Sequence, residues 1–383
     1  MRNRIESVDL LRGIAMVLMA LDHTRDFFGA ADNPTDVAKA SSALFLTRWV
    51  THLCAPTFFL LTGVGAGLAR ATRTRSELTR FLVTRGAILI VLELTLFRSL
   101  YQFNVDYSVT MLLVIWALGW SMIFLGTVIA LPMWAVGTIG GALILGHNAL
   151  DGLRIAHPLW AVLHGPGFVV RSESVTVFAS YPLIPWIGVT AVGYALSGLY
   201  DLQVKTRLAY LLNLGLACVI GFLVLRYLNI YGDPSPWKYQ TNDTRTVLSF
   251  LNTTKYPPSL LYLLMTLGPA FFILRWLDDG GPQWLRPIIT FGKAPLFYFG
   301  AHFLLIHAAA VVVAGITHGS AGALGMFQSP DLGNYPFTRA PDWGFPLPVV
   351  WVVWIAVVAA MYPACKWMVA LKERRAHPWL TYL

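Results

Sequence analysis

Long apolar runs recur along the whole chain, and each has the length of about 20 residues that a helix needs to cross a hydrocarbon core of roughly 30 Å. Only a turn around Leu131 and Pro132 separates the fourth run from the fifth, so nine or eleven spans remain compatible with the pattern. The ten predicted spans are residues 8–28, 42–69, 79–100, 109–131, 133–149, 176–199, 208–229, 257–276, 290–314 and 347–371. The pattern predicts an all-α, polytopic integral membrane protein with about ten transmembrane helices.

The composition supports this class of protein. Of the 383 residues, 56% are hydrophobic and only 12% are charged, whereas an average soluble domain has about 25% charged residues. The segments between the predicted spans are too short for a soluble domain of usual size, so residues 1–383 are expected to form a single transmembrane domain. The net charge of +9 favours contact with anionic membrane lipids and gives no reason to invoke nucleic acid.

Lysine and arginine mark the cytoplasmic side of a membrane protein when they gather in short loops near the span ends. With ten spans, the basic residues of these loops all fall on one side, which predicts cytoplasmic termini and a multi-pass protein of the cell (inner) membrane. They are Arg2, Arg4, Arg70, Arg73, Arg75, Arg80, Arg85, Lys205, Arg207, Lys372, Arg374 and Arg375. The sequence leaves the oligomeric state open, a homodimer included.

The first predicted span carries charged residues along one face. A helix advances about 100° and 1.5 Å per residue, so Arg12 and His23 lie within about 20° of one face and roughly 16 Å apart along the axis. Asp9 and Asp26 extend the same stripe. A charged side chain near mid-bilayer costs about 2.5–3.5 kcal/mol, so the stripe predicts a hydrated groove. The alternative is that these charges snorkel or pair at the two interfaces.

Histidine exchanges protons near neutral pH, which makes His23 the candidate general base. Asp26 follows one helical turn later and is expected to fix the tautomer of His23. Because the first two spans form a hairpin, His52 is expected to approach His23, with a histidine bonded to a neighbouring carbonyl as an equal alternative. Arg25 either lines the same groove or lies at the outer headgroups.

Further candidates precede or begin later spans. Lys255 and Tyr256 stand before a proline pair, and Lys255 is expected either to hold an anionic or sugar group or to snorkel as a cation. Tyr181 and Trp186 belong to a proline-kinked aromatic segment that either stacks on sugars or forms an interfacial belt.

The remaining histidines and the cysteines give weaker signals. His302 and His307 are about 140° apart on a helix, so they cannot both face one site directly. Cys54, Cys218 and Cys365 lie in or beside predicted spans without metal-ligand spacing. No metal is predicted.

Five segments carry a resemblance to a known family. They are RIESVDLLRGIAMVLMALDHTRDFF, RWVTHLCAPTFFLLTG, YPLIPWIGVTAVGYALSGLY, LNTTKYPPSLLYLLMTLGP and GKAPLFYFGAHFLLIH. In this order they resemble the bacterial branch of the heparan-alpha-glucosaminide N-acetyltransferase-like membrane proteins, from Arg4 to about His307, with residues 8–314 as the best match. The start of the chain is also similar to membrane acyltransferases that acetylate cell-surface polysaccharides, whose first helix carries an Arg, ten intervening residues and a His, here Arg12 and His23.

The resemblance implies a membrane-embedded acyltransferase that moves an acetyl group from cytoplasmic acetyl-CoA to a hydroxyl or amine of a sugar or glycan acceptor at the outer face. Arg12 is then expected to attract a phosphate of CoA, with Arg70 and Arg73 as further CoA-binding residues. His23 acts as the base, and direct transfer and an acyl-histidine intermediate are both compatible with the residues. Asp26 and His52 assist catalysis, and the acceptor side is lined by Arg25, Tyr181, Trp186, Lys255, Tyr256 and His302.

One departure from the family concerns its catalytic histidine, which the lysosomal enzyme carries in the loop after the first span. Residues 29–51 contain no histidine, so His23 or His52 takes over that function or the function is absent. Two other classes of protein therefore stay open. One is a carrier or proton-coupled permease for a small polar solute, in which the same groups relay protons. The other is a degenerate family member with a structural role. The chain lacks the paired broken spans of inverted-repeat transporters, which argues against the carrier.

Overall fold

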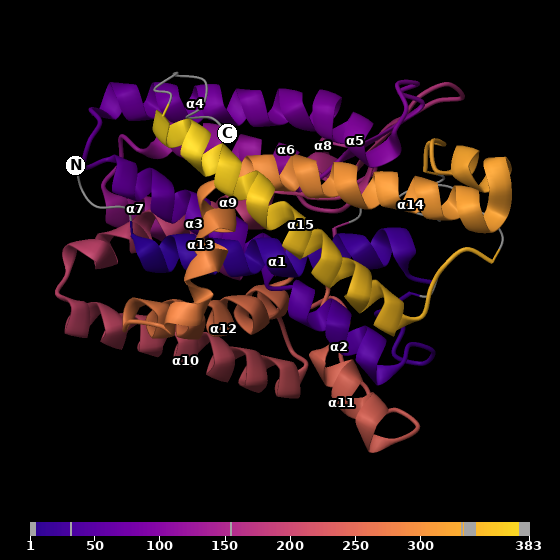
Figure 1. Ribbon diagram of the computed structural model, residues 1–383. Helices are drawn as coiled ribbons and strands as arrows, with labels where there is room; N and C mark the ends of the chain where they lie inside the picture. Colours follow the sequence, from indigo (N-terminus) through magenta and orange to yellow (C-terminus); the bar gives the residue numbers. More distant parts are fainter. Residues whose placement is uncertain (1–4, 31–32, 154, 331, 333–341, 375–383) are drawn as a thin grey trace.

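A computed structural model describes residues 5–30, 33–153, 155–330, 332 and 342–374. Its long helices run side by side as a bundle, with α4 along one edge, α10 along the opposite edge and α1 between them (Figure 1). The α-helices are α1 (Glu6–Phe28), α2 (Ser42–Thr51), α3 (Cys54–Ala69), α4 (Arg75–Leu92), α5 (Arg98–Gln102), α6 (Val114–Val128), α7 (Met133–Gly146), α8 (Pro158–Leu163), α9 (Leu183–Leu196), α10 (Val204–Leu228), α11 (Asp243–Leu251), α12 (Leu260–Asp278), α13 (Ile289–Lys293), α14 (Pro295–Gly325) and α15 (Leu347–Arg374). Four short helices of other types are η1 (Glu93–Phe97), η2 (His147–Leu150), η3 (Ser197–Asp201) and η4 (Gln283–Ile288).

Seven helical segments of the described residues are long and apolar enough to cross a membrane, so the chain is a mostly helical, multi-pass membrane protein. They are Ser42–Ala69, Met133–Leu150, Leu183–Asp201, Val204–Leu228, Leu260–Asp278, Pro295–Gly325 and Leu347–Arg374. The three other predicted spans fall on α1, on the continuous stretch from α4 to α5, and on α6, which is apolar but shorter. α1 is not among these seven segments because it carries too many charged residues to count as apolar.

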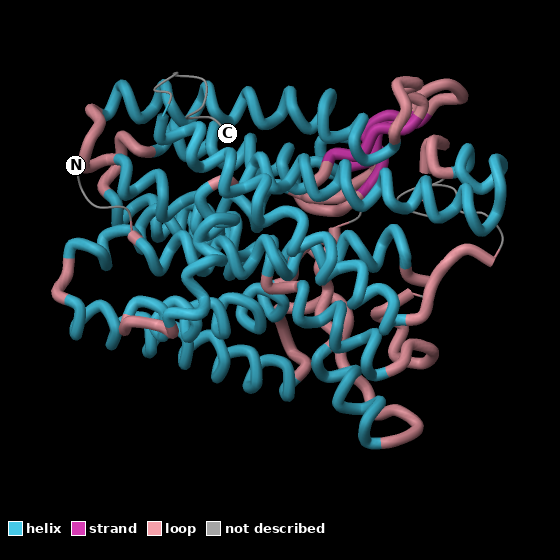
Figure 2. Tube along the Cα trace, viewed as in Figure 1, coloured by secondary structure: helices cyan, strands magenta, loops and turns pink. Residues whose placement is uncertain are grey.

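A small sheet, drawn in magenta in Figure 2, interrupts the helical pattern. β3 (Thr176–Ala179) lies in the middle, parallel to β1 (Val109–Leu112) and antiparallel to β2 (Gly167–Arg171). The all-α prediction missed this sheet and wrongly assigned residues 109–112 and 176–179 to spans. Both runs are short, apolar and close to the start of a helix, and hydrophobicity alone does not separate such strands from the beginning of a helix.

α1 holds the centre of the bundle, where it contacts α2, α3, α12, α13, α14 and α15. Leu10 and Leu11 of α1 are buried in an apolar cluster shared with α3, α9 and α12. Met16, Met19 and Phe27 are buried in a second cluster shared with α14 and α15. Most of the surface of α1 is therefore covered by protein, which allows its polar residues to find partners on other helices.

Local sequence signals set the helices around α1. The side chain of Ser41 accepts a hydrogen bond from the first turn of α2, and Thr74 and Glu77 form a capping box at the start of α4. α3 and α9 approach each other closely through Gly63 and Gly193, because a Cβ at either position would collide with a backbone carbonyl of the other helix. This close packing fixes α3, and with it the turn that connects α2 to α3.

Candidate functional site

Two histidines that are 279 residues apart in the sequence meet inside the bundle. Nδ1 of His23 on α1 lies 2.7 Å from Nε2 of His302 on α14. Nδ1 of His302 lies 2.8 Å from the backbone oxygen of Tyr298, one helical turn earlier. Because a carbonyl only accepts hydrogen bonds, this pattern assigns the proton of His302 to Nδ1, so its Nε2 accepts from Nδ1–H of His23. Nε2 of a neutral His23 is then unprotonated.

Aromatic rings hold the histidine pair in place. The ring of Phe303 lies 4.1 Å from that of His23, and Phe299 meets His23 edge-on at 6.3 Å. His302 is fully buried, whereas His23 is only partly buried. The prediction that Asp26 fixes the His23 tautomer is corrected here, because His302 occupies Nδ1 of His23 and the carboxylate of Asp26 pairs with Arg25 at 2.6 Å.

Asp22 ties the His23 turn of α1 to α2. Its carboxylate pairs with Arg48 of α2, lies 3.0 Å from Nη2 of Arg25 and accepts a 3.1 Å hydrogen bond from the hydroxyl of Thr51. The side chains of Asp22 and Arg48 are 13% and 12% exposed. Removing one member of such a buried pair leaves an uncompensated charge, so the network fixes the position of His23.

Two buried side chains next to this network have unused hydrogen-bonding capacity. Within the described residues, Nε and Nη1 of Arg25 have no hydrogen-bond partner, although the side chain is only 9% exposed. Nδ1 of His52 also lacks one there, and its ring packs 5.3 Å from the ring of Tyr262 at the turn between α2 and α3. A buried polar group left without a partner costs about 1–3 kcal/mol, so these atoms are suited to meet a polar ligand.

Lys255, in the segment before α12, brings a further positive charge to this region. It lies within electrostatic range of Asp22, His23 and His52, and its Nζ is 5.2 Å from the centre of the Tyr256 ring. Burial opposes ionisation of the Tyr256 hydroxyl, but the positive charges of Lys255 and neighbouring arginine outweigh this effect and lower the pKa of Tyr256. The region therefore favours a ligand with negative charge or several oxygen atoms.

The predicted aromatic wall continues from Tyr256. Tyr181 meets the Tyr256 ring edge-on at 5.4 Å and stacks on Trp186 at 5.6 Å. Trp186 in turn stacks on Phe59 at 4.5 Å and has no exposed surface. Tyr256 is 39% exposed, so it is the member of this group that offers surface to a ligand, while Trp186 supports Tyr181 from inside.

The arginines expected to bind CoA lie in separate places. Arg12 donates to the carboxylate of Asp9 at 2.7 Å and to the backbone oxygen of Gly292 at 3.1 Å. Arg70 follows α3, is half exposed, and lines a cavity of about 380 Å³ together with Arg75 and the turn between α6 and α7. The guanidinium of Arg73 lies over the ring of Phe81. Arg70 thus borders a cavity, as a CoA-binding residue is expected to do.

His302 and His307 face different places, as expected. The ring nitrogens of His307 lie 3.2 Å from the backbone oxygen of Leu100 and 2.8 Å from that of Met326, whereas His302 meets His23. The sequence reasoning missed Arg48 as a site residue. A usable signal existed, because Asp22 inside a predicted span needs a buried cation. Arg48 stands on the facing span of the same hairpin.

Comparison with protein families confirms the family over the first part of the chain, and the predicted continuation of the match to residue 314 stays a prediction. The family described as heparan-alpha-glucosaminide N-acetyltransferase, catalytic, matches residues 4–231, which is more than half of the chain. The match includes His23, Arg48 and His52, whereas Lys255 and His302 lie beyond it. No curated protein matches the chain.

Proposed function

The chain belongs to the heparan-alpha-glucosaminide N-acetyltransferase catalytic family, and from this premise we propose that it moves an acetyl group from cytoplasmic acetyl-CoA to a hydroxyl or amine of a sugar or glycan at the outer face. The observation that carries the proposal is the hydrogen bond between His23 and His302. It leaves an unprotonated imidazole nitrogen on a partly buried side chain, beside a cluster of charged and polar groups.

The topology that this activity requires has ten spans, cytoplasmic termini and an inner-membrane location. In Figure 1, α1 and α4 run in a similar direction to the long apolar helices α10 and α14, and this course together with the seven long apolar segments supports ten spans. In this arrangement Arg12 and Arg70 belong to the cytoplasmic half and His23 to the outer half. The acetyl group then has to pass along α1.

In the proposed reaction, Nε2 of His23 takes the proton of the acceptor while the acceptor oxygen or nitrogen attacks the carbonyl carbon of the acetyl thioester. His302 keeps accepting from Nδ1–H, so the imidazolium that forms retains its partner. The carbon–sulfur bond then breaks, and the CoA thiolate takes the proton from His23. A general base contributes about 10²–10⁴-fold, and positioning of both substrates supplies much of the rest.

The polar neighbours of His23 are assigned to acceptor binding. Nε and Nη1 of Arg25, which have no hydrogen-bond partner among the described residues, are donors suited to an acceptor oxygen or to the negative charge that develops on the thioester oxygen. Lys255 and Tyr256 extend this surface, and His52 offers a further ring nitrogen. Arg12 and Arg70 are assigned to the CoA phosphates, and the cavity beside Arg70 supports the second of these roles.

The test uses the full chain purified in detergent and acetyl-CoA labelled in the acetyl group. Binding, hydrolysis and transfer to glucosamine are measured for the wild type, His23→Ala and Arg12→Ala. His318→Ala provides a control on the outer part of α14. We expect His23→Ala to bind acetyl-CoA and to lose at least about 100-fold in turnover, the lower end of what a base contributes. Arg12→Ala should weaken binding.

Single-turnover labelling separates the two chemical routes. Acetyl label that stays on the wild-type protein in the absence of an acceptor, and is lost in His23→Ala, indicates an acyl-histidine intermediate. A folded wild type that binds no acetyl-CoA would overturn the transferase proposal. The polar stripe of α1 would then be tested as a solute path.

A further inference from the structure

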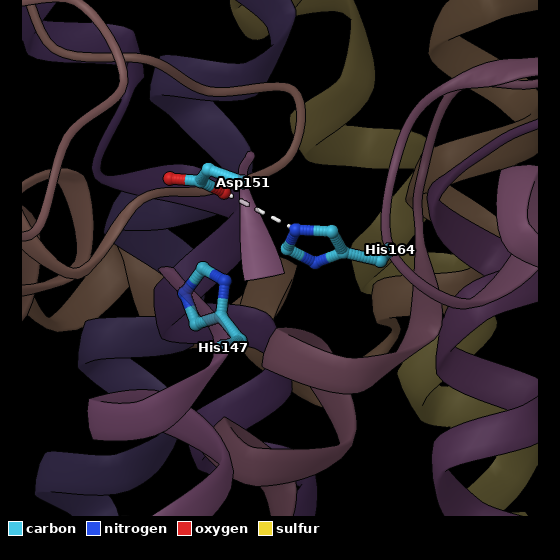
Figure 3. A group of neighbouring side chains, drawn as sticks. All are labelled: His147, Asp151 and His164. Carbon is cyan, nitrogen blue, oxygen red and sulfur yellow. Dashed lines mark ion pairs between the residues drawn. The ribbon is translucent and has the colours of Figure 1, made fainter. Parts of the chain in front are cut away.

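A second cluster of polar side chains lies between α7 and the sheet, apart from the His23 region. It consists of His147 in η2, Asp151 directly after η2, and His164 after α8 (Figure 3). One potential ligand atom from each residue lies within 4.8 Å of the other two. Nε2 of His164 is 3.2 Å from Oδ1 of Asp151.

Within the described part of the chain, the hydrogen bonds and ion pairs of these side chains do not account for their burial. His147 is 2% exposed, yet neither of its ring nitrogens has a hydrogen-bond partner there. His164 is 3% exposed, and its Nδ1 also lacks one. An ion pair between His164 and Asp151 accounts for two of the three side chains and leaves His147 with a desolvated polar ring. A ligand that all three side chains share would account for the whole cluster.

We propose that His147, Asp151 and His164 bind a divalent transition-metal ion, with Zn²⁺ as the best fit. Two imidazoles and one carboxylate are typical Zn²⁺ ligands, with bond lengths of about 2.0–2.2 Å. Tetrahedral geometry at these bond lengths separates neighbouring ligand atoms by about 3.3–3.5 Å. The 3.2 Å between Nε2 of His164 and Oδ1 of Asp151 is close to this separation. The ligand atom of His147 lies within 4.8 Å of both, so metal binding requires the His147 side chain to move closer to them.

The surroundings of Asp151 suit a metal ligand. Its Oδ2 accepts a 2.7 Å hydrogen bond from the side-chain amide of Asn148, which leaves Oδ1 directed toward His164. Such a hydrogen bond orients a ligating carboxylate.

The position of the cluster indicates a structural role. A metal would join the end of α7 to the segment after α8 and close the chain between Asp151 and His164. The side-chain oxygen of Asn148 also accepts a hydrogen bond from the backbone N–H of Leu260 at the start of α12. This bond connects the cluster to the segment that carries Lys255. A surface hollow of about 480 Å³, lined by Trp160 and other residues that flank His164 in the sequence, offers a route for the ion.

The test measures Zn²⁺ binding by the full chain in detergent, after chelator treatment and removal of the chelator. The wild type is compared with His147→Gln, Asp151→Asn and Asn148→Ala. Glu173→Gln, in the loop between β2 and β3, is the matched control because Glu173 is exposed and its carboxylate is not part of the cluster. Loss of an outer partner of a metal ligand typically weakens binding by about 10–100-fold, which is expected for Asn148→Ala. Loss of a ligand should weaken binding by more than about 100-fold. Co²⁺ in place of Zn²⁺ should give the visible absorption of a tetrahedral site.

The result that supports the site is one Zn²⁺ per chain in the wild type and in Glu173→Gln, with a loss of about 10–100-fold in Asn148→Ala and a larger loss in the two ligand variants. If His147→Gln does not fold, Asp151→Asn and Asn148→Ala still test the site. Asp151→Asn keeps a polar side chain of the same size, and Asn148→Ala introduces only a small side chain. A wild type that takes up less than one Zn²⁺ per chain, or folded ligand variants that bind like the wild type, would overturn the proposal. None of these readouts depends on acetyl transfer.

Discussion

Replacing His302 by phenylalanine isolates the contribution of the histidine pair. Phenylalanine keeps an aromatic ring between Phe299 and Phe303 but removes the acceptor 2.7 Å from Nδ1 of His23. Neutral His23 avoids an unpartnered N–H by moving its proton to Nε2, and this removes the base. Protonated His23 carries a proton on both ring nitrogens, so its Nδ1–H stays without a partner. A cost of about 1–3 kcal/mol for this unpartnered N–H is therefore expected to appear in the transition state. At 1.36 kcal/mol per tenfold, the turnover of acetyl-CoA should fall by about 5–150-fold.

The assay is the initial rate of acetyl transfer or hydrolysis, with kcat and KM for acetyl-CoA determined separately. We expect kcat to carry the loss and KM to stay unchanged, because His302 is assigned no contact with CoA. His302→Gln offers an amide oxygen as a new acceptor and should recover part of the rate. Tyr298→Phe is the matched control, since the Tyr298 hydroxyl has no hydrogen-bond partner within the described residues and the carbonyl that holds His302 is kept. A folded His302→Phe protein with wild-type kcat would refute the role of the pair.

Three further changes test the packing around the site by thermal or denaturant unfolding in detergent. Asp22→Asn leaves Arg48 buried without its countercharge and should destabilise the fold by about 3–5 kcal/mol, whereas an unchanged midpoint would mean that water already screens the pair. Thr74→Ala removes the N-cap of α4 and should cost about 1 kcal/mol, which a stability equal to that of the wild type would contradict. Gly63→Ala pushes α3 away from α9 and should cost about 1–3 kcal/mol. Gly65→Ala on the same helix faces open space and should be neutral or stabilising, so equal effects at the two glycines would refute the close-packing interpretation.

The sequence predicted the parts of the fold that depend on local pattern. Apolar length located most of the helices, and the spacing of Arg12 and His23 identified α1 as a helix with a polar stripe before any contact was known. The angular separation of His302 and His307 also predicted that one of them lies elsewhere. These inferences succeed because a helix has a fixed period, and because a charge inside a span is costly enough to require a reason.

The contacts between distant segments could not be predicted in the same way. Nothing local in the sequence indicates that His302 rather than Asp26 accepts from His23, since that pairing depends on how α1 and α14 pack. The cluster around His147 was missed for a related reason. His147 and Asp151 stand four residues apart, but His164 reaches them only through the turn after α8. The strands β1 and β3 were missed because two short apolar runs pair across a long sequence separation.

The central place of α1 explains why its charges are tolerated. On a lipid-facing helix, Asp22, Arg25 and Asp26 would each face a cost of about 2.5–3.5 kcal/mol at mid-bilayer. In the bundle, α1 contacts six α-helices and η4, Asp22 and Asp26 are both paired, and Arg48 of α2 completes the network. The packing that gives these charges their partners also holds His23 beside His302. A helix whose composition is too polar for a lipid-facing span therefore fits at the centre of the bundle, because protein rather than lipid surrounds its polar face.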